Sequence, residues 1–352
     1  MSELPARYAD MTDDQVLAAI RRAKQTLGAD LTILGHHYQR DEVIQFADQR
    51  GDSLGLSQQA AKTTSKYIVF CGVFFMAETA AILCKPEQTV IQPVLEAFCP
   101  MAAMANAREG EQAWAALTGL WGDDLIPITY QNSIAELKAV VGQRGGAVCT
   151  SSNADKLFRW AFAQKGHILF MPDQYLGTNT ALAMGIPRAQ IGMWDRDGAD
   201  VAALAACRVV VWPGFCYVHS SFKPEDVDAA RSQYPGALVI VHPECSSEVV
   251  ARSDATGSTT GIIEYIERAP VGSTIVVGTE WHLVDRLGRQ FTDRHVVPLR
   301  RSPCKTMGMT TIRHLLYVLD SILEGTPCNI VTVDAETATW ARVALERMLR
   351  AS

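Results

Sequence analysis

Short apolar runs rich in β-branched residues alternate with amphipathic stretches along the whole chain. The apolar runs predict strands at residues 31–34, 67–70, 89–91, 125–129, 147–149, 168–170, 209–212, 238–241 and 273–277. The stretches between them predict helices that include residues 12–27, 41–50, 53–62, 77–83, 133–140, 154–164, 224–234, 260–269 and 310–324. Strands that alternate with helices in this way predict an α/β fold built on parallel sheets.

Composition excludes several classes of protein. The 352 residues are 48% hydrophobic and 20% charged, which is enough for two or three packed domains. A net charge of −6 gives no broad cationic surface, so we expect neither nucleic acid nor membrane as a partner. The dense apolar run at 67–77 has 11 residues and is interpreted as a buried strand with the turn after it. The polar, acidic start resembles no signal or transit peptide, and we expect a cytoplasmic protein.

A threefold internal repetition divides the chain. Three predicted strands end at a ring-bearing residue, a hydroxyl residue at a predicted helix start follows after 17, 21 or 16 residues, and a cysteine ends each unit. In chain order the sets are His36, Ser53 and Cys99; Tyr130, Ser151 and Cys216; and His242, Ser258 and Cys304. The step from hydroxyl to cysteine is 46 residues in the first and third sets and 65 in the middle one. We therefore expect three related α/β domains, at 1–105, 106–219 and 220–352, with the C-terminal helix able to pack back on the first.

The chain has nine cysteines, an odd number with no C-x-x-C pair, which argues against disulfides, zinc ribbons and thioredoxin-like motifs. Most are expected to be small buried hydrophobes. Cys99, Cys216 and Cys304 differ because each lies in a turn-like context next to Pro or Phe. If the three units packed about one axis, three thiolates could bind one zinc ion or iron–sulfur cluster. In a [4Fe–4S] cluster, three ligands would leave one iron open to a substrate oxygen.

Several motifs together resemble the quinolinate synthase family. They occur in the family's order from about Leu31 to Leu323: ILGHHYQRDEV, GDSLGLSQQA, FCGVFFMAETAAIL, CPMA, TYQNS, CTSSNA, FMPDQYLG, WPGFCYVH, HPECSSEVV, DATGST and CKTM. The resemblance implies three three-layer αβα domains around a pseudo-threefold axis, with the cluster and the active site at its centre. It also implies a [4Fe–4S] cluster held by Cys99, Cys216 and Cys304.

The activity that the resemblance implies is a non-redox transferase reaction of NAD biosynthesis. Iminoaspartate and dihydroxyacetone phosphate would condense to quinolinate, phosphate and water, with the open iron as Lewis acid. A functional link to the enzyme that supplies iminoaspartate is expected. The sequence departs from the family at Gly35, Ala103 and Gly308, and we assign no catalytic role to Ala103 or Gly308.

Both substrates are anionic, and hydroxyl side chains at helix N-termini supply donors for anions without a net positive charge. By motif position, the substrate-binding residues would be Ser53, Ser151, Ser258 and Thr259, for which simple N-capping is the alternative role. Asn132 would add an amide, against an alternative role in a turn. Asp52 is predicted to cap the helix that starts at Ser53.

The reaction also needs groups that move protons at carbon and oxygen, which is the work of His, Glu and Tyr near neutral pH. Glu244 is our candidate for the general base and for orienting a substrate hydroxyl. Tyr38 and Tyr130 would each position or protonate an oxygen. His36 and His242 would bind carboxylate or phosphate, with proton transfer as a second role.

Two other functions remain open from the sequence. An electron-transfer or redox-sensing iron–sulfur protein would need a fourth thiolate, for which Cys245 is the best candidate. A protein that binds phosphorylated metabolites would need no cluster. We interpret Cys245 as a non-ligand thiol because it has no counterpart in the other two units. His37 lacks a counterpart too and is predicted to be structural or solvent-facing, and Trp212, Met307 and Met309 are predicted to be packing residues.

Overall fold

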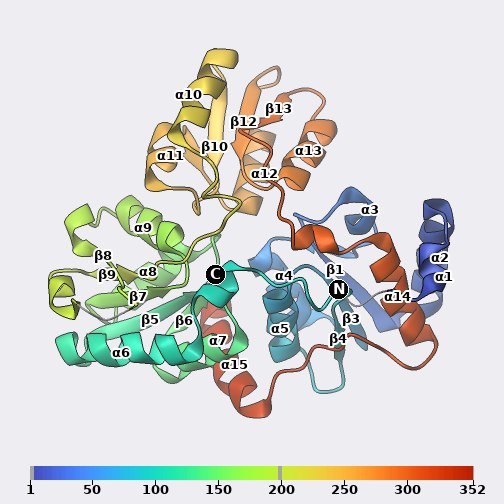
Figure 1. The fold of residues 1–352 in the computed structure, drawn as a ribbon, viewed down its shortest axis with the longest axis horizontal. Helices are drawn as coiled ribbons and strands as arrows, with labels where there is room; N and C mark the ends of the chain where they lie inside the picture. The colour runs from blue at the N-terminus through green and yellow to red at the C-terminus, as the bar shows by residue number, and fades with distance from the viewer. Residues whose placement is uncertain (1–3, 197–199, 352) are drawn as a thin grey trace. The chain divides into compact units, whose positions relative to one another are not determined.

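The structure, a computed structural model, describes residues 4–196 and 200–351. Within these ranges the strands form three sheets, and each pair of hydrogen-bonded strands is parallel (Figure 1). Helices flank each sheet, so the predicted α/β fold is confirmed. The chain divides into two compact units: Met1–Cys99 with Pro303–Val333, and Pro100–Ser302 with Asp334–Ser352. No helix in the described ranges is long and apolar enough to cross a bilayer.

The first unit is built on a sheet with the strand order β2-β1-β3-β4. The strands are β1 (Leu31–His36), β2 (Gln49–Gly51), β3 (Tyr67–Cys71) and β4 (Thr89–Ile91). The helices are α1 (Ala6–Ala9), α2 (Asp13–Leu27), α3 (Asp41–Ile44), α4 (Ser53–Lys62), α5 (Phe74–Leu83) and α14 (Ile312–Leu323). Helices α2 and α14 share a core with β1 and β3, whereas α4 and α5 pack together. Asp52 caps α4 by accepting the Gly55 N–H at 2.9 Å, as predicted.

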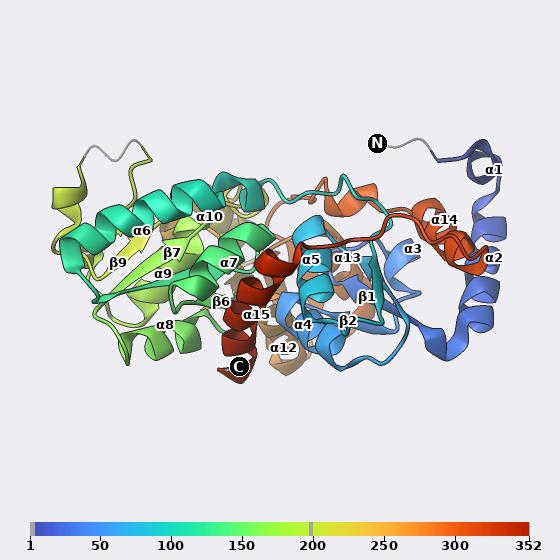
Figure 2. The same cartoon turned by 90° about the horizontal axis from the view of Figure 1, so that it is seen from below.

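The second unit contains the other two sheets. The middle sheet, in the order β6-β5-β7-β9-β8, comprises β5 (Leu125–Tyr130), β6 (Ala147–Cys149), β7 (His167–Met171), β8 (Ile191–Met193) and β9 (Val209–Val211). Its helices are α6 (Ala107–Trp121), α7 (Ala135–Gln143), α8 (Ala154–Phe162), α9 (Gln174–Ala183) and α15 (Ala335–Arg350). Helices α6 and α7 pack together, as do α8 and α9, and Figure 2 shows α6 and α8 on opposite sides of this sheet.

The third sheet has the order β11-β10-β12-β13. Its strands are β10 (Leu238–Val241), β11 (Ala255–Thr256), β12 (Thr274–Gly278) and β13 (His295–Pro298). Its helices are α10 (Pro224–Gln233), α11 (Ser247–Arg252), α12 (Thr259–Arg268) and α13 (Trp281–Gln290). Val227 of α10 and Val249 of α11 join Val239 and Val241 of β10 in a buried core.

The predicted repetition is present in the strand order. In each sheet the ring-bearing residue stands at the end of the first strand in the chain, namely β1, β5 or β10. The hydroxyl residue follows the edge strand β2, β6 or β11, and the cysteine comes five to eight residues after β4, β9 or β13. The middle sheet carries the additional edge strand β8 before β9, which accounts for its longer step from hydroxyl to cysteine.

Some local predictions were wrong. The helix predicted at 41–50 ends at Ile44, because Gln49–Gly51 pairs with β1 as strand β2. The turn predicted after β3 is shorter than expected, because the helix predicted at 77–83 already begins at Phe74, as α5. The C-terminal region contains a further helix, α15, beyond the one predicted at 310–324. Helix α14 packs against α2 in the first unit, whereas the last helix, α15, packs against α7 and β6 of the middle sheet (Figure 2). The boundaries of three domains stay a prediction.

Candidate active site

Two histidines at the ends of equivalent strands share one local geometry. The Nδ1 atom of His242, just after β10, accepts the N–H of Glu244 at 3.3 Å. The Nδ1 atom of His36, the last residue of β1, accepts the N–H of Tyr38 at 3.1 Å. In both rings, therefore, Nδ1 faces the backbone N–H of the residue two positions further on. The residue two positions after each histidine is thereby turned to the same side as the ring.

Glu244 is bonded to a second histidine that the sequence analysis did not single out. Its Oε2 atom lies 2.6 Å from Nδ1 of His219, and both side chains are 2% exposed. The other ring nitrogen of His219 lies 3.1 Å from Oγ1 of Thr279. The His219 ring stacks on the His242 ring with centroids 4.2 Å apart, and Oε2 of Glu244 is 3.9 Å from Nδ1 of His242. Glu244, His219 and His242 thus form one buried acid–base group.

Burial alone would raise the pKa of Glu244, but its neighbours outweigh burial and lower the pKa to about 2. The opposing causes are the charges of His219 and His242 and hydrogen bonds from His219 and from the hydroxyl of Tyr130. Tyr130, the last residue of β5, is therefore brought to Glu244 from the middle sheet. Glu244 is a carboxylate at neutral pH, stabilised by donors rather than by solvent.

A cysteine adjoins this group. Sγ of Cys216, a ring nitrogen of His219 and a carboxylate oxygen of Glu244 all lie within 4.8 Å of one another. Cys216 is partly exposed, while the other two residues are buried. Thiolate, imidazole and carboxylate are all metal ligands, so this corner of the second unit combines proton-transfer groups with a metal-binding donor.

The loop that carries Cys216 is held by the start of α9. The N–H of Gln174 donates to the Gly214 carbonyl at 2.9 Å, and Asp173 and Gly214 form a parallel β-bridge. Asp173 is fully buried and caps α9 by accepting the Leu176 N–H at 2.6 Å. Burial and the nearby charge of Glu244 raise the pKa of Asp173 well above its ordinary value. Asp173 therefore belongs to the surroundings of the site, although no role was predicted for it.

Two of the predicted substrate-binding hydroxyls line one pocket in the second unit. Ser151, before α8, and Ser258, the N-cap of α12, border a pocket of about 320 Å³ together with Asn179, Thr256 and Pro243. Ser258 also caps its helix by accepting the Gly261 N–H at 3.2 Å, so it fills the alternative role as well. Pro243 directly precedes Glu244, which links the pocket wall to the acid–base group.

Asn132 and Thr259 also lie at starts of loops or helices in this unit. The Oδ1 atom of Asn132, two residues after Tyr130, is buried and has no hydrogen-bond partner among the described residues. Thr259 is the first residue of α12 and is 3% exposed. Asn132 thus has a buried acceptor that a ligand could satisfy.

The first unit contains the remaining predicted residues. The rings of His36 and Tyr38 meet edge to face with centroids 4.7 Å apart. Ser53 is the first residue of α4, directly after the capping Asp52. Beside them, the side-chain amide of Gln39 donates to the carbonyl of Met307 at 3.1 Å, which ties this loop to the segment that follows Cys304. Met307 and, in the second unit, Trp212 are buried, as predicted for packing residues.

The cysteines separate by environment. Five of the nine lie in loops or at a helix end and are partly exposed, namely Cys84, Cys99, Cys216, Cys304 and Cys328. The fully or largely buried thiols are Cys71, Cys149, Cys207 and Cys245, and burial raises the pKa of each. Metal ligation needs a thiolate, which burial in apolar surroundings disfavours. Burial therefore disfavours Cys245 as a ligand, whereas Cys99, Cys216 and Cys304 are set apart from Cys84 and Cys328 by their places in the repetition. Cys99 and Cys304 belong to the first unit and Cys216 to the second.

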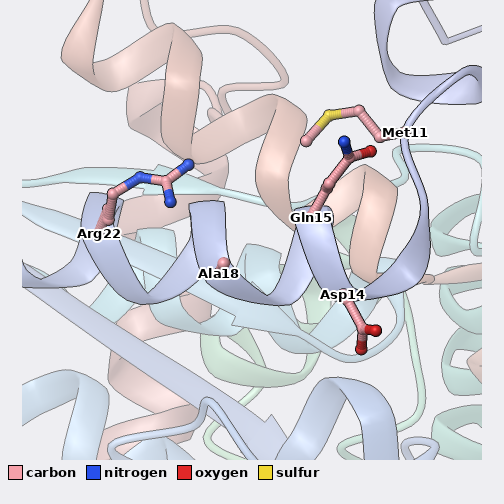
Figure 3. Close-up of a pocket in the computed structure, with 5 residues that line it drawn as sticks. All are labelled: Met11, Asp14, Gln15, Ala18 and Arg22. Carbon is pink, nitrogen blue, oxygen red and sulfur yellow. The ribbon is translucent and has the colours of Figure 1, made fainter.

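A further hollow lies on the outer face of α2 and is lined by Met11, Asp14, Gln15, Ala18 and Arg22 (Figure 3). It contains no predicted site residue. Its two charged side chains come from opposite ends of the hollow and carry opposite signs (Figure 3). One acidic and one basic side chain give this hollow no preference for an anionic ligand.

His219 could have been found from the sequence by its spacing. It lies three residues after Cys216 in the motif WPGFCYVH, and an (i, i+3) spacing brings two side chains to one side of a turn or helix. Asp173 belongs to another quoted motif, FMPDQYLG, where an Asp just before a predicted helix is also a common N-cap. Neither spacing revealed that both residues lie near Glu244.

Comparison with known proteins gives concordant matches. The family model described as quinolinate synthetase A protein matches residues 18–350. A quinolinate synthase of Geobacillus thermodenitrificans is 47% identical over 355 residues, covering 99% of this chain and 97% of the relative. Those of Anoxybacillus flavithermus and Acidobacterium capsulatum are also 47% identical, covering 98% and 97% of this chain and 96% and 94% of the relatives.

Proposed function

Because the chain belongs to the quinolinate synthetase A family, we propose that it condenses iminoaspartate with dihydroxyacetone phosphate to form quinolinate, phosphate and water for NAD biosynthesis. The observation that best supports this reaction is the buried group of Glu244, His219 and His242 beside the thiol of Cys216. The group offers proton transfer and a metal ligand within one small volume. Condensation followed by loss of water requires both the removal and the return of protons.

We propose that a [4Fe–4S] cluster is the resident cofactor, held by Cys99, Cys216 and Cys304. Their equivalent places in the repetition together with their partial exposure support this set, and the burial of Cys245 argues against a fourth thiolate there. When bound with three protein ligands, such a cluster supplies a Lewis-acidic iron for a substrate oxygen. The alternative redox protein needs the fourth ligand, so no observation favours it.

We assign substrate binding to other residues of the second unit. Ser151 and Ser258 border the pocket and would donate to carboxylate or phosphate oxygens, as would Thr259. Asn132 would use its buried Oδ1 to accept an N–H or O–H of a substrate. Tyr130, which donates to Glu244, would position or protonate an oxygen next to it.

Glu244 and His219 would act as one acid–base pair. The hydrogen bond between Oε2 and Nδ1 lets a proton that reaches either residue be shared by both. Glu244 would also orient a substrate hydroxyl. In the first unit, His36, Tyr38 and Ser53 would bind carboxylate or phosphate and position an oxygen.

The partners in this proposal are small molecules, with the enzyme that supplies iminoaspartate as a functional neighbour. We place the reaction in the cytoplasm because thiolate ligands and an odd set of nine cysteines suit a reducing compartment. Neither nucleic acid nor membrane has a part in it.

The test is turnover by protein purified and reconstituted without oxygen. Quinolinate is measured after addition of iminoaspartate and dihydroxyacetone phosphate, and iron and sulfide are quantified on the same sample. We expect about four irons and four sulfides per chain, together with quinolinate. Cluster-loaded protein that forms no quinolinate would refute the proposed reaction.

The ligand set is tested separately. Cys99→Ser, Cys216→Ser and Cys304→Ser should each lose most of the bound iron, because one missing thiolate leaves two ligands. Cys245→Ser is the matched control and should bind as much iron as the unaltered protein. Loss of iron in the control, with retention in Cys216→Ser, would mean that the ligands have been assigned wrongly.

A further inference from the structure

The side-chain amide of Asn179, in α9, forms hydrogen bonds on both sides of Glu244 in the loop that carries it. The Nδ2 atom of Asn179 donates to the carbonyls of Pro243 and Cys245, each at 2.8 Å. The Oδ1 atom of Asn179 accepts from Oγ of Ser247, also at 2.8 Å. These partners lie immediately before, immediately after and three residues after Glu244. An amide has four hydrogen-bonding sites, and three of those of Asn179 bind this one loop.

The loop is also held at its start, where the His242 N–H donates to the Gly278 carbonyl at 3.0 Å and the Glu244 N–H to Nδ1 of His242 at 3.3 Å. It is the short connection between the end of β10 at Val241 and the start of α11 at Ser247. Its own backbone supplies the bond from the Cys245 N–H to the His242 carbonyl at 3.0 Å. The carbonyls of Pro243 and Cys245 point instead toward Asn179, which is 8% exposed. Buried carbonyls that lose their donor are costly, so removal of the amide would make the loop rearrange.

Helix α9 also holds the other half of the acid–base pair. Its first turn is bonded to Gly214, in the loop that leads to Cys216 and His219. Asn179 lies six residues after Asp173, about 9 Å further along the helix axis. The loop with His219 and the loop with Glu244 are therefore attached to one rigid element at two points. The 2.6 Å bond between Glu244 and His219 depends on the distance between those points.

We propose that Asn179 is a positioning residue, whose amide fixes the 243–247 loop and thereby sets the contact between Glu244 and His219. The effect of Asn179 on turnover rests on the proposed function, whereas its effect on the loop does not. Asn179 also borders the pocket that contains Ser151 and Ser258, but its amide is already bonded to Pro243, Cys245 and Ser247. It acts through the backbone on either side of the acid–base residue.

The experiment compares Asn179→Ala and Asn179→Asp with the unaltered protein, reconstituted without oxygen. Asp keeps the volume of Asn but has no N–H donor, so a shared effect excludes a cavity as the cause. We expect kcat for quinolinate formation to fall about 10- to 100-fold, which is typical of a misplaced acid–base group. We expect the fall in kcat to exceed any rise in KM, because Asn179 borders the proposed substrate pocket but acts mainly through the loop. Iron content should be unchanged, because no cluster ligand is altered.

Amide hydrogen exchange gives a second readout that does not depend on activity. Exchange over residues 242–248 should become faster in both variants. Ser247→Ala removes only the hydrogen bond to Oδ1 of Asn179. It can be measured in place of Asn179→Ala if that variant does not fold. It should lower kcat about two- to fivefold, as loss of one hydrogen bond predicts. The matched control is Ser253→Ala at the other end of α11, which removes a bond to Val249 within the helix and should change neither readout.

The outcomes separate the two proposals. Unchanged exchange over 242–248 in Asn179→Ala overturns the positioning role, whatever the activity. Faster exchange with unchanged kcat makes Asn179 a purely structural residue and overturns it as well. If the unaltered protein forms no quinolinate, the proposed function fails, and the exchange measurement alone decides whether Asn179 fixes the loop.

Discussion

Gly214 is the position where one added methyl group should test the geometry of the cysteine loop. A Cβ atom at Gly214 would lie 3.2 Å from the Pro172 carbonyl carbon and 3.2 Å from Cβ of Met104, and well inside van der Waals contact of the Pro172 oxygen. The obstructing oxygen belongs to the backbone at the end of β7, so it cannot swing aside as a flexible side chain would. Gly214→Ala must therefore push the loop away by about 1 Å.

Two contributions set the expected loss of stability in Gly214→Ala. Overpacking of a tight site costs about 1–3 kcal/mol. The hydrogen bond from the Gln174 N–H to the Gly214 carbonyl, 2.9 Å long, contributes about 1 kcal/mol and breaks when the loop moves. The sum, about 2–4 kcal/mol, should lower Tm by roughly 3–5 °C in a chain of this size. Because Cys216 is only two residues further on, we also expect the variant to bind less iron than the unaltered protein.

The assay is thermal unfolding of the metal-free protein, followed by iron quantitation after anaerobic reconstitution. The matched control is Gly119→Ala in α6, where an added Cβ meets nothing within 4 Å. There the better helix propensity of Ala should raise stability by about 0.5–1 kcal/mol. Equal Tm values for the two variants, or full iron binding by Gly214→Ala, would refute the argument that close backbone approach holds this loop.

Two more predictions concern packing and pH. Gly142→Ala in α7 would place a Cβ against the backbone of Trp340 in α15. The resulting overpacking, about 1–3 kcal/mol, should exceed the gain of about 1 kcal/mol from the helix propensity of Ala, so Tm should fall. A Tm at or above that of Gly119→Ala would contradict this. Asp173 has a raised pKa in the folded protein, so its contribution to stability is full below about pH 3.9, the ordinary Asp pKa, and is lost as the pH rises through the folded pKa. The free energy of unfolding of Asp173→Asn, relative to that of the unaltered protein, should therefore rise by about 1.4 kcal/mol per pH unit across that window. It is measured by urea unfolding of the metal-free proteins. A difference between the two proteins that does not change with pH would exclude the raised pKa.

The sequence predicted the interior of each sheet better than its edges. The central strands β1, β5 and β10 are buried on both faces and therefore read as continuous apolar runs. The strands that were missed, β2, β8, β11 and β13, all lie at sheet edges. An edge strand has one neighbour and an exposed side, so it can be short and polar, as Gln49–Gly51 is. Helix 41–50 was overextended for the same reason, since its last residues form that edge strand.

The repetition predicted positions in the site but not their chemistry. It selected His36 and His242, whose rings accept equivalent backbone bonds, and it selected Cys99, Cys216 and Cys304, whose role as ligands stays a prediction. A comparison of repeats selects what they share, however, and an active site on a repeated scaffold needs residues that differ. His219 lies three residues after its cysteine, where the other repeats have Ala102 and Met307.

Glu244 shows the same asymmetry. It lies two residues after the ring-bearing position, where the other repeats have Tyr38 and Asn132. The pair of Glu244 and His219 joins a loop after β9 of the middle sheet to a loop after β10 of the third. No periodicity within either repeat specifies that contact, because it depends on how two sheets pack in one unit and on a helix, α9, that is bonded to both loops. Tyr38→Glu would therefore not create a second acid–base group, because the residues at the positions equivalent to His219, Ala102 and Met307, have no imidazole.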